Sequence, residues 1–148
     1  VFAYQGRSFG KEQPKYLTIR LDNDTTKIFG LDRVDNNKQI YAVEGPLDSL
    51  FLDNCIAVGG SDLNKLESDV IIIFDNEPRN KEICKQMEFC ISSYKKLVIW
   101  PDGMKHKDIN DMIVAGYTKE QIQEIITDNT FLGAAAQVRF SEWRKINA

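Results

Sequence analysis

Acidic side chains follow three short apolar runs of this sequence, a pattern that suggests a reaction site. They are Glu44, Asp48, Asp75, Glu77 and Asp108. Carboxylates that crowd together repel one another, so such a group must be offset by protonation, by basic partners or by a hard divalent cation. Oxygen donors without histidine or cysteine fit Mg²⁺ or Mn²⁺ rather than zinc, and such sites usually leave room for water and phosphate oxygens. The chemistry indicated is phosphoryl or nucleotidyl transfer.

For these carboxylates to meet, the runs before them have to be parallel strands of one sheet. Residues 39–43, 69–74 and 97–100 are short, apolar segments with helical patterns after them, as in parallel sheets covered on both faces. The carboxyl ends of such strands lie at one edge, where open α/β sheets bind ligands. We therefore predict an α/β fold with a parallel sheet flanked by helices. For the first acidic pair, the alternative is an ordinary acidic first turn of a helix that Gly45 and Pro46 would open.

The chain before residue 36 has a different pattern. Residues 1–4 and 16–21 alternate apolar with polar side chains and are separated by glycines and a proline, which predicts short antiparallel strands. Residues 27–31 add another extended piece. We expect this opening part to be a small antiparallel basic segment in front of the parallel sheet. The predicted division of the chain is 1–36, 37–116 and 117–148.

Three further segments have helical signals. The segment after Pro78 has apolar residues at helical spacing, and these are Ile83, Met87, Cys90, Ile91 and Tyr94. Thr118 and Gln121 form a capping-box pattern at the start of a later helix. The tail has a looser spacing, through Ala135, Val138, Trp143 and Ile146. It could be a closing helix or a docking surface for a partner.

Basic residues are concentrated in the first twenty positions, although the formal net charge of the 148 residues is −3. They are Arg7, Lys11, Lys15 and Arg20, set against Glu12. A basic platform beside an acidic pocket is compatible with nucleic acid, and a solvated face is the alternative. Tyr16 could stack on a base or belong to the core. Gly59 and Gly60 at a strand end could let a ligand approach the backbone, or form a simple tight turn.

Several classes of function have no support in the sequence. No Ser-His-Asp, P-loop or G-x-G-x-x-G pattern is present, and the three cysteines form no C-x-x-C pair. His106 could be a general base, but between Lys105 and Lys107 it is better explained as a surface residue. No segment resembles a membrane span or a signal peptide, so we expect a cytoplasmic protein without a membrane partner. Because Val1 falls inside a strand-like run, we expect the chain to be part of a longer one.

The order of these motifs resembles the TOPRIM fold shared by bacterial-type primases, topoisomerases and some nucleases. The resemblance rests on Glu44-Gly45 with Asp48, on Gly59-Gly60, and on Asp75-x-Glu77 after a very apolar strand. Residues 5–16 and 28–31 resemble the basic segment before the core of DnaG-type replicative primases, and 100–108 resemble the acidic element of that family. The ending 139–144 is similar to primases of large tailed phages. The match covers about residues 1 to 116.

The resemblance implies synthesis of short RNA primers on single-stranded DNA. It implies that Glu44, Asp75 and Glu77 are catalytic and hold Mg²⁺ or Mn²⁺, and that Asp48 and Asp108 complete the metal site. Contacts to nucleotide or template would come from the basic segment and the glycine pair: Arg7, Lys15, Tyr16, Arg20, Gly59 and Gly60. The implied partners are ribonucleoside triphosphates, single-stranded DNA and a replicative helicase, in a bacterial host cytoplasm if the protein is phage-encoded. A zinc module would lie upstream of Val1.

The sequence departs from the family pattern at two positions and leaves two rival functions open. The family more often has Asp where Glu77 stands, and a second aspartate is common where Asn110 stands. The nearest rival is a TOPRIM metal-dependent nuclease of the overcoming-lysogenization type. The other is a receiver-like signalling module, which also gathers aspartates around magnesium but has no use for the platform from Arg7 to Tyr16.

Overall fold

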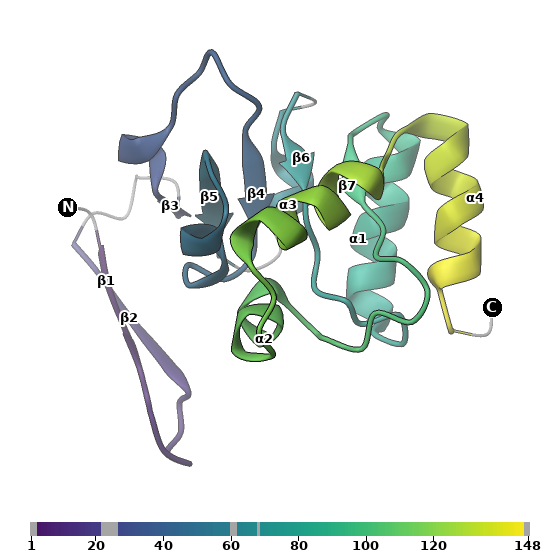
Figure 1. Ribbon diagram of the computed structural model, residues 1–148. Coiled ribbons are helices and arrows are strands. Elements are labelled where there is room, and N and C mark those ends of the chain that lie inside the picture. The colour runs from purple at the N-terminus through teal and green to yellow at the C-terminus, as the bar shows by residue number, and fades with distance from the viewer. Residues whose placement is uncertain (1–2, 22–26, 60–61, 68, 147–148) are drawn as a thin grey trace.

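The computed structural model describes residues 3–21, 27–59, 62–67 and 69–146 (Figure 1). The strands are β1 (Ala3–Arg7), β2 (Tyr16–Arg20), β3 (Ile28–Phe29), β4 (Tyr41–Val43), β5 (Cys55–Val58), β6 (Ile71–Ile72), β7 (Leu97–Val98) and β8 (Thr130–Phe131). The α-helices are α1 (Lys81–Ser92), α2 (Ile109–Val114), α3 (Lys119–Asp128) and α4 (Gly133–Trp143). Short 3₁₀ turns are η1 (Leu31–Arg33), η2 (Asp48–Phe51) and η3 (Leu63–Lys65).

The described strands form a six-stranded sheet and a separate two-stranded hairpin. The order in the large sheet is β3-β5-β4-β6-β7-β8, and β5, β4, β6 and β7 are parallel to one another. Ala42 of β4 is in register with Ile56 on one side and Ile72 on the other. The prediction of an α/β fold with a parallel sheet is confirmed, and the strand before Asp75 lies inside the sheet, between β4 and β7.

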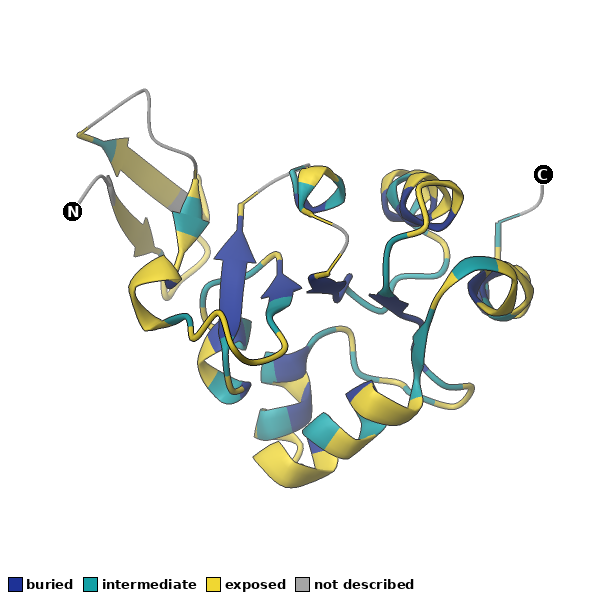
Figure 2. Ribbon diagram, turned by 90° about the horizontal axis from the view of Figure 1, so that it is seen from above, coloured by how far each residue is buried: buried dark blue, intermediate teal, exposed yellow. Residues whose placement is uncertain are grey.

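Helices cover both faces of this sheet. Viewed from above, α1, η3 and α4 lie on one side of the buried strands, and α2 and α3 lie on the other (Figure 2). All four residues of β5 are buried, as are Leu97 and Val98 of β7. Strands that are apolar on both faces have to be covered on both faces, which explains the continuous apolar runs in the sequence.

Two short antiparallel strands close the edges of the sheet. β3 pairs with β5, and β8 pairs with β7 through Leu97↔Phe131 and Val98↔Thr130. The extended piece expected at residues 27–31 is present as β3, whereas β8 is unexpected, because a two-residue strand is too short for a periodic signal. Parts of the chain before residue 36 and after residue 117 therefore contribute strands to the same sheet.

The first predicted helix is only a 3₁₀ turn. Gly45 and Pro46 lead into η2, which spans Asp48–Phe51, and the Ser49 side chain donates a hydrogen bond to the Pro46 carbonyl at 2.7 Å. The alternative of an acidic first turn of an α-helix, with its macrodipole, is thereby removed for this pair, since no α-helix begins here in the described chain.

The buried faces of two helices differ from the prediction. Tyr94 was expected on the buried face of α1, but it lies after the helix end with φ 53° and is 72% exposed. In α4 the buried residues are Ala136, Phe140 and Trp143, whereas Val138 is 59% exposed. The tail is thus a closing helix, as one of the two alternatives held, but its apolar face starts one residue later than predicted.

The antiparallel strands predicted near the N-terminus form the hairpin β1-β2, with Arg7 opposite Tyr16. In Figure 1 this hairpin extends downward at the left of the view, below β3. The three cysteines are buried and unpaired. No helix among the described residues is long and apolar enough to cross a membrane.

Candidate metal and nucleotide site

The predicted acidic residues meet at the carboxyl ends of the parallel strands. Glu44 follows β4, Asp75 and Glu77 lie in the loop after β6, and Asp108 caps the N-terminus of α2 after β7. Burial raises the pKa of the Asp75 carboxyl, and the charges of Glu44, Asp108 and Asp48 add to the rise. These residues come from separate loops, so the parallel strands are what bring them together.

Asp48 is held at this edge by the loop that contains Gly45. Its Oδ1 accepts a hydrogen bond from the backbone N–H of Asn110 at 2.7 Å, which joins η2 to the start of α2. A Cβ on residue 45 would meet Asp48 Oδ2, so a larger residue there would push this carboxylate out of its position. Burial raises the pKa of Asp48 to about 6, against the opposing effect of the Asn110 hydrogen bond. Asn110 therefore contributes its backbone to the site, although it lacks the carboxylate common in the family.

Lys107 lies between the two carboxylates of the loop after β6. Its Nζ is 3.5 Å from Asp75 Oδ2 and 3.5 Å from Glu77 Oε1. Burial raises the pKa of Asp75 to about 7, Glu44 adds to the rise, and Lys107 opposes it. Asp75 and Glu77 thus face the same cation. The contact of Lys107 with both carboxylates could not be expected from the motif at residues 100–108.

Glu44 is the most accessible of the strand-end carboxylates. It is exposed to solvent, and desolvation still raises its pKa, with Lys107 opposing and Glu77 adding to the rise. These interactions place Glu44 in the electrostatic field of the loops after β6 and β7. An exposed carboxylate beside a buried one can reach a bound ion or substrate from the solvent side.

The donor set fits a hard divalent cation. Asp48, Asp75 and Asp108 line a cavity of about 10 Å³ together with apolar residues, which is about the space of one water molecule. Oxygen donors of this kind suit Mg²⁺ or Mn²⁺. Within the described residues, however, no three such side chains lie close enough together to hold an ion as they stand. The carboxylates have to move, and the Lys107 ammonium has to be displaced from Asp75 or Glu77, for direct coordination.

Asn76, between the two acidic residues, joins their loop to the rest of the site. Its backbone N–H donates to the Lys107 carbonyl at 2.6 Å, and its side-chain amide donates to the carbonyls of Met104 at 2.9 Å and His106 at 3.1 Å. Its Oδ1 accepts a hydrogen bond from Trp143 Nε1 at 2.9 Å. Asn76 therefore fixes the loop that carries Lys107 and Asp108, and α4 in turn fixes Asn76.

Removing the Trp143 hydrogen bond is expected to affect the site beyond its effect on stability. Trp143→Phe deletes one buried hydrogen bond, which costs on the order of 1 kcal/mol of unfolding free energy. Tyr41→Phe is a matched control, because it deletes the hydrogen bond from Gln123 to the Tyr41 hydroxyl, 3.0 Å long and at the opposite end of β4. We expect urea unfolding to show the larger loss for Trp143→Phe, because the smaller ring also leaves a gap in the core. Only this variant should weaken binding of Mg²⁺ at the acidic edge, by about fivefold in isothermal titration calorimetry, and equal Mg²⁺ affinity in the two variants would contradict the positioning role.

The predicted basic residues lie on or near the hairpin, away from the acidic loops. Arg7 ends β1, and Lys15 and Tyr16 follow the turn, where the Ser8 N–H donates to the Lys15 carbonyl at 2.9 Å. Arg20 ends β2. Gly59 is exposed at the end of β5, and a Cβ there would meet no atom within 4 Å. Gly60 lies outside the described residues. The binding roles of these six residues remain predictions.

The chain is similar to DNA primases in both sequence and fold. It is 37% identical over 151 residues to the DNA primase of Enterobacteria phage T4, an alignment that covers 97% of this chain and 44% of the phage protein. The chain is a homologue of a DNA primase. The resemblance to DNA primases seen in the sequence is thereby confirmed. The chain spans less than half the length of this relative, and no family model matches it.

Solved primase structures share the fold. The zinc-binding and RNA polymerase domains of the Aquifex aeolicus primase align with a TM-score of 0.63 and 20% identity, over 97% of this chain and 41% of that one. The Escherichia coli primase catalytic core aligns with a TM-score of 0.62 and 21% identity, over 92% and 50%. A DNA primase domain from Pseudomonas aeruginosa aligns with a TM-score of 0.63 and 21% identity, over 95% of this chain and 50% of that one. These likenesses confirm the primase-core fold.

Proposed function

We propose that this chain carries the catalytic site of a DNA primase, which joins ribonucleotides into short primers on single-stranded DNA during replication. The observation that carries the proposal is the acidic edge of the sheet, in a chain that aligns over nearly its whole length with a phage DNA primase. Carboxylates that suit a divalent cation are what nucleotidyl transfer requires. In this proposal the core is of the TOPRIM type, and the protein works in the cytoplasm of a bacterial host.

The proposed roles follow from where the side chains lie. Glu44, Asp75 and Glu77 would hold Mg²⁺ or Mn²⁺, with Asp48 and Asp108 completing or orienting the site. A divalent ion bound there would neutralise charge on the attacking and leaving oxygens. Asp48 and Asp108 each accept a backbone hydrogen bond at the start of α2, which orients their carboxylates toward the same cavity.

Other parts of the proposal concern the longer protein. The Aquifex aeolicus structure includes a zinc-binding domain, and we propose a comparable zinc module upstream of Val1 and a helicase partner. We also propose the three-part division at residues 1–36, 37–116 and 117–148, with β3 and β8 as the strands that the first and last parts add to the common sheet.

Incubation of labelled single-stranded DNA with ribonucleoside triphosphates and Mg²⁺ tests the proposal. We expect short RNA products that require all three components and disappear when EDTA removes the metal. Shortening of the DNA strand without RNA synthesis would instead indicate the TOPRIM nuclease, and transfer of phosphate from a small donor to an aspartate would indicate the receiver-like module.

Lys15→Ala tests the basic hairpin. If Lys15 neutralises one phosphate of the template, its loss should weaken single-stranded DNA binding and reduce the slope of log K against log salt by about 0.7. Fluorescence anisotropy at several salt concentrations measures this slope. Lys38→Ala is the control, because Lys38 lies in an exposed turn after η1 and pairs with Asp35 at 3.9 Å. An unchanged slope in Lys15→Ala would exclude the phosphate contact.

A further inference from the structure

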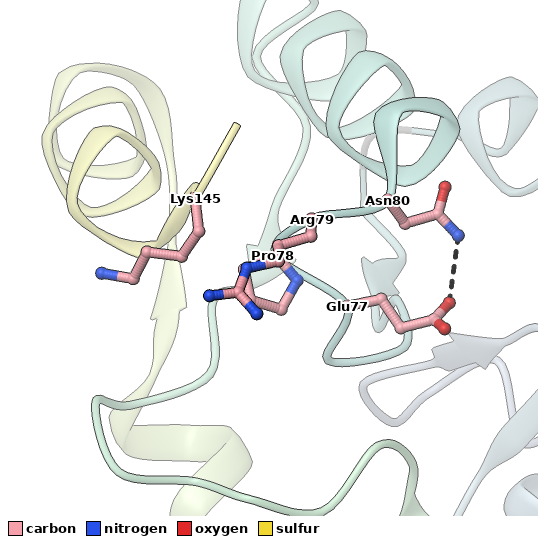
Figure 3. A pocket seen from close by; sticks show the side chains of 5 residues that line it. All are labelled: Glu77, Pro78, Arg79, Asn80 and Lys145. Carbon is pink, nitrogen blue, oxygen red and sulfur yellow. Dashed lines mark hydrogen bonds between the residues drawn. The ribbon is translucent and has the colours of Figure 1, made fainter. Parts of the chain in front are cut away.

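A pocket of about 610 Å³ adjoins the acidic edge on the side of α4. Its lining residues come from the loop after β6, the start of α1 and the end of the chain, and they are Glu77, Pro78, Arg79, Asn80 and Lys145. In Figure 3, Lys145 and the Glu77–Asn80 pair lie on opposite sides of Pro78 and Arg79. The volume is in the range of small-molecule sites, which runs from roughly 300 to 1,000 Å³.

The walls of this pocket are fixed by contacts between distant segments. The backbone N–H of Lys145 donates to the Pro78 carbonyl at 2.9 Å, and Arg144 pairs with Glu88 of α1 at 2.5 Å. Asn80 caps α1 by accepting from the N–H groups of Glu82 and Ile83 at 3.0 and 3.3 Å. Together with the Trp143–Asn76 hydrogen bond, these contacts hold the chain end against the loop after β6.

The charge in this pocket favours an anion. Arg79 makes no hydrogen bond or ion pair with any described residue, so its five N–H donors are available to a ligand. Lys145 Nζ donates once, to the Glu142 carbonyl at 3.0 Å, and has two donors left. The one carboxylate of the lining, Glu77, is already engaged by Lys107 at 3.5 Å and by the Asn80 amide at 3.1 Å.

Glu77 belongs to both the pocket and the acidic edge. An anion in the pocket would therefore lie next to the proposed metal site, which limits what kind of anion it can be. In nucleotidyl transfer the 3′ hydroxyl loses its proton to solvent and its oxygen bonds to the α-phosphorus, while the bond from that phosphorus to its β-bridging oxygen breaks and releases pyrophosphate. The β- and γ-phosphates, which leave as pyrophosphate, must therefore extend from the metal site into the space beside it. Resting on the proposed function, we infer that this pocket holds the β- and γ-phosphates of the incoming ribonucleoside triphosphate through Arg79 and Lys145.

Binding of inorganic tripolyphosphate tests this inference without requiring catalysis. By isothermal titration calorimetry in metal-free buffer, we expect Arg79→Ala and Lys145→Ala each to weaken tripolyphosphate binding by about fivefold, because a charge-assisted contact is lost. Lys85→Ala is the matched control, since Lys85 is exposed on α1 and is not part of the pocket lining. Arg79→Lys should restore part of the affinity, which a folding defect would not explain.

Kinetics and DNA binding then separate this site from the function on which it rests. In primer synthesis, Arg79→Ala should raise the KM for ribonucleotides about fivefold and leave the affinity for single-stranded DNA unchanged. Unaltered tripolyphosphate binding in both alanine variants overturns the inference. A loss of DNA affinity as large as the loss of tripolyphosphate affinity also overturns it, because the pocket would then hold the nucleic acid backbone. If no variant and no wild-type protein makes primers, the proposed function fails while the tripolyphosphate result still decides whether the pocket binds polyphosphate.

Discussion

Glu44→Gln is expected to abolish primer synthesis while leaving the fold intact. Gln has nearly the shape of Glu but lacks the charge that a divalent cation requires. Loss of one charged metal contact removes several kcal/mol of transition-state stabilisation, which is on the order of a thousandfold in rate. Glu44 is exposed at the end of β4, so its substitution leaves no buried group without a partner. Quantified RNA products at saturating Mg²⁺ measure the effect.

The matched control for this variant is Glu124→Gln, an exposed substitution of the same type on α3. It should leave primer synthesis within about twofold of the wild type. Circular dichroism and thermal unfolding should be indistinguishable for the wild type and both variants, because surface substitutions usually change the free energy of unfolding by less than about 0.5 kcal/mol. Full activity in Glu44→Gln would remove Glu44 from the site and with it the main support for the proposed mechanism.

The fold and the acidic edge could be predicted because their signals are local. Residues 69–74 are almost continuously apolar, so a buried strand follows from composition, and the position of Asp75 at its end follows from the chain order. The same reasoning placed Glu44 after residues 39–43 and Asp108 after residues 97–100. Parallel strands then bring their carboxyl ends to one edge without further information.

The contacts that complete the site could not be predicted because they join distant segments. Asn76 meets Trp143 across 67 positions, and Asp48 meets the Asn110 backbone across 62. One signal in the sequence pointed to Asn76: its side-chain amide has hydrogen-bond donors and an acceptor, and it stands between two carboxylates. Its partners depend on how α4 packs, and the face of α4 was itself placed one residue off.

Asp75→Asn is expected to have opposite effects on stability and activity. The pKa of Asp75 is raised from 3.8 to about 7 in the folded protein, chiefly by burial. The folded state therefore holds this proton more tightly than the unfolded chain does. The contribution of the protonated Asp75 carboxyl to the free energy of unfolding is fully present below about pH 4. It is lost as the pH rises through 7, unless a divalent cation offsets the charge.

In metal-free buffer the free energy of unfolding of the wild type should fall by on the order of 2 kcal/mol between pH 5 and pH 8, since a shift of this size has an upper bound of about 4 kcal/mol. Asp75→Asn, which cannot ionise, should show a much smaller fall, whereas Asp32→Asn, an exposed substitution on η1, should follow the wild type. Added Mg²⁺ should raise the free energy of unfolding of the wild type at pH 8 but should not change that of Asp75→Asn. The Asp75→Asn variant should make no primers. A wild type whose stability is the same at both pH values without metal would mean that the Lys107 ammonium already compensates the Asp75 charge. The acidic edge would then need no bound cation to be stable, and a requirement for metal would belong to the reaction alone.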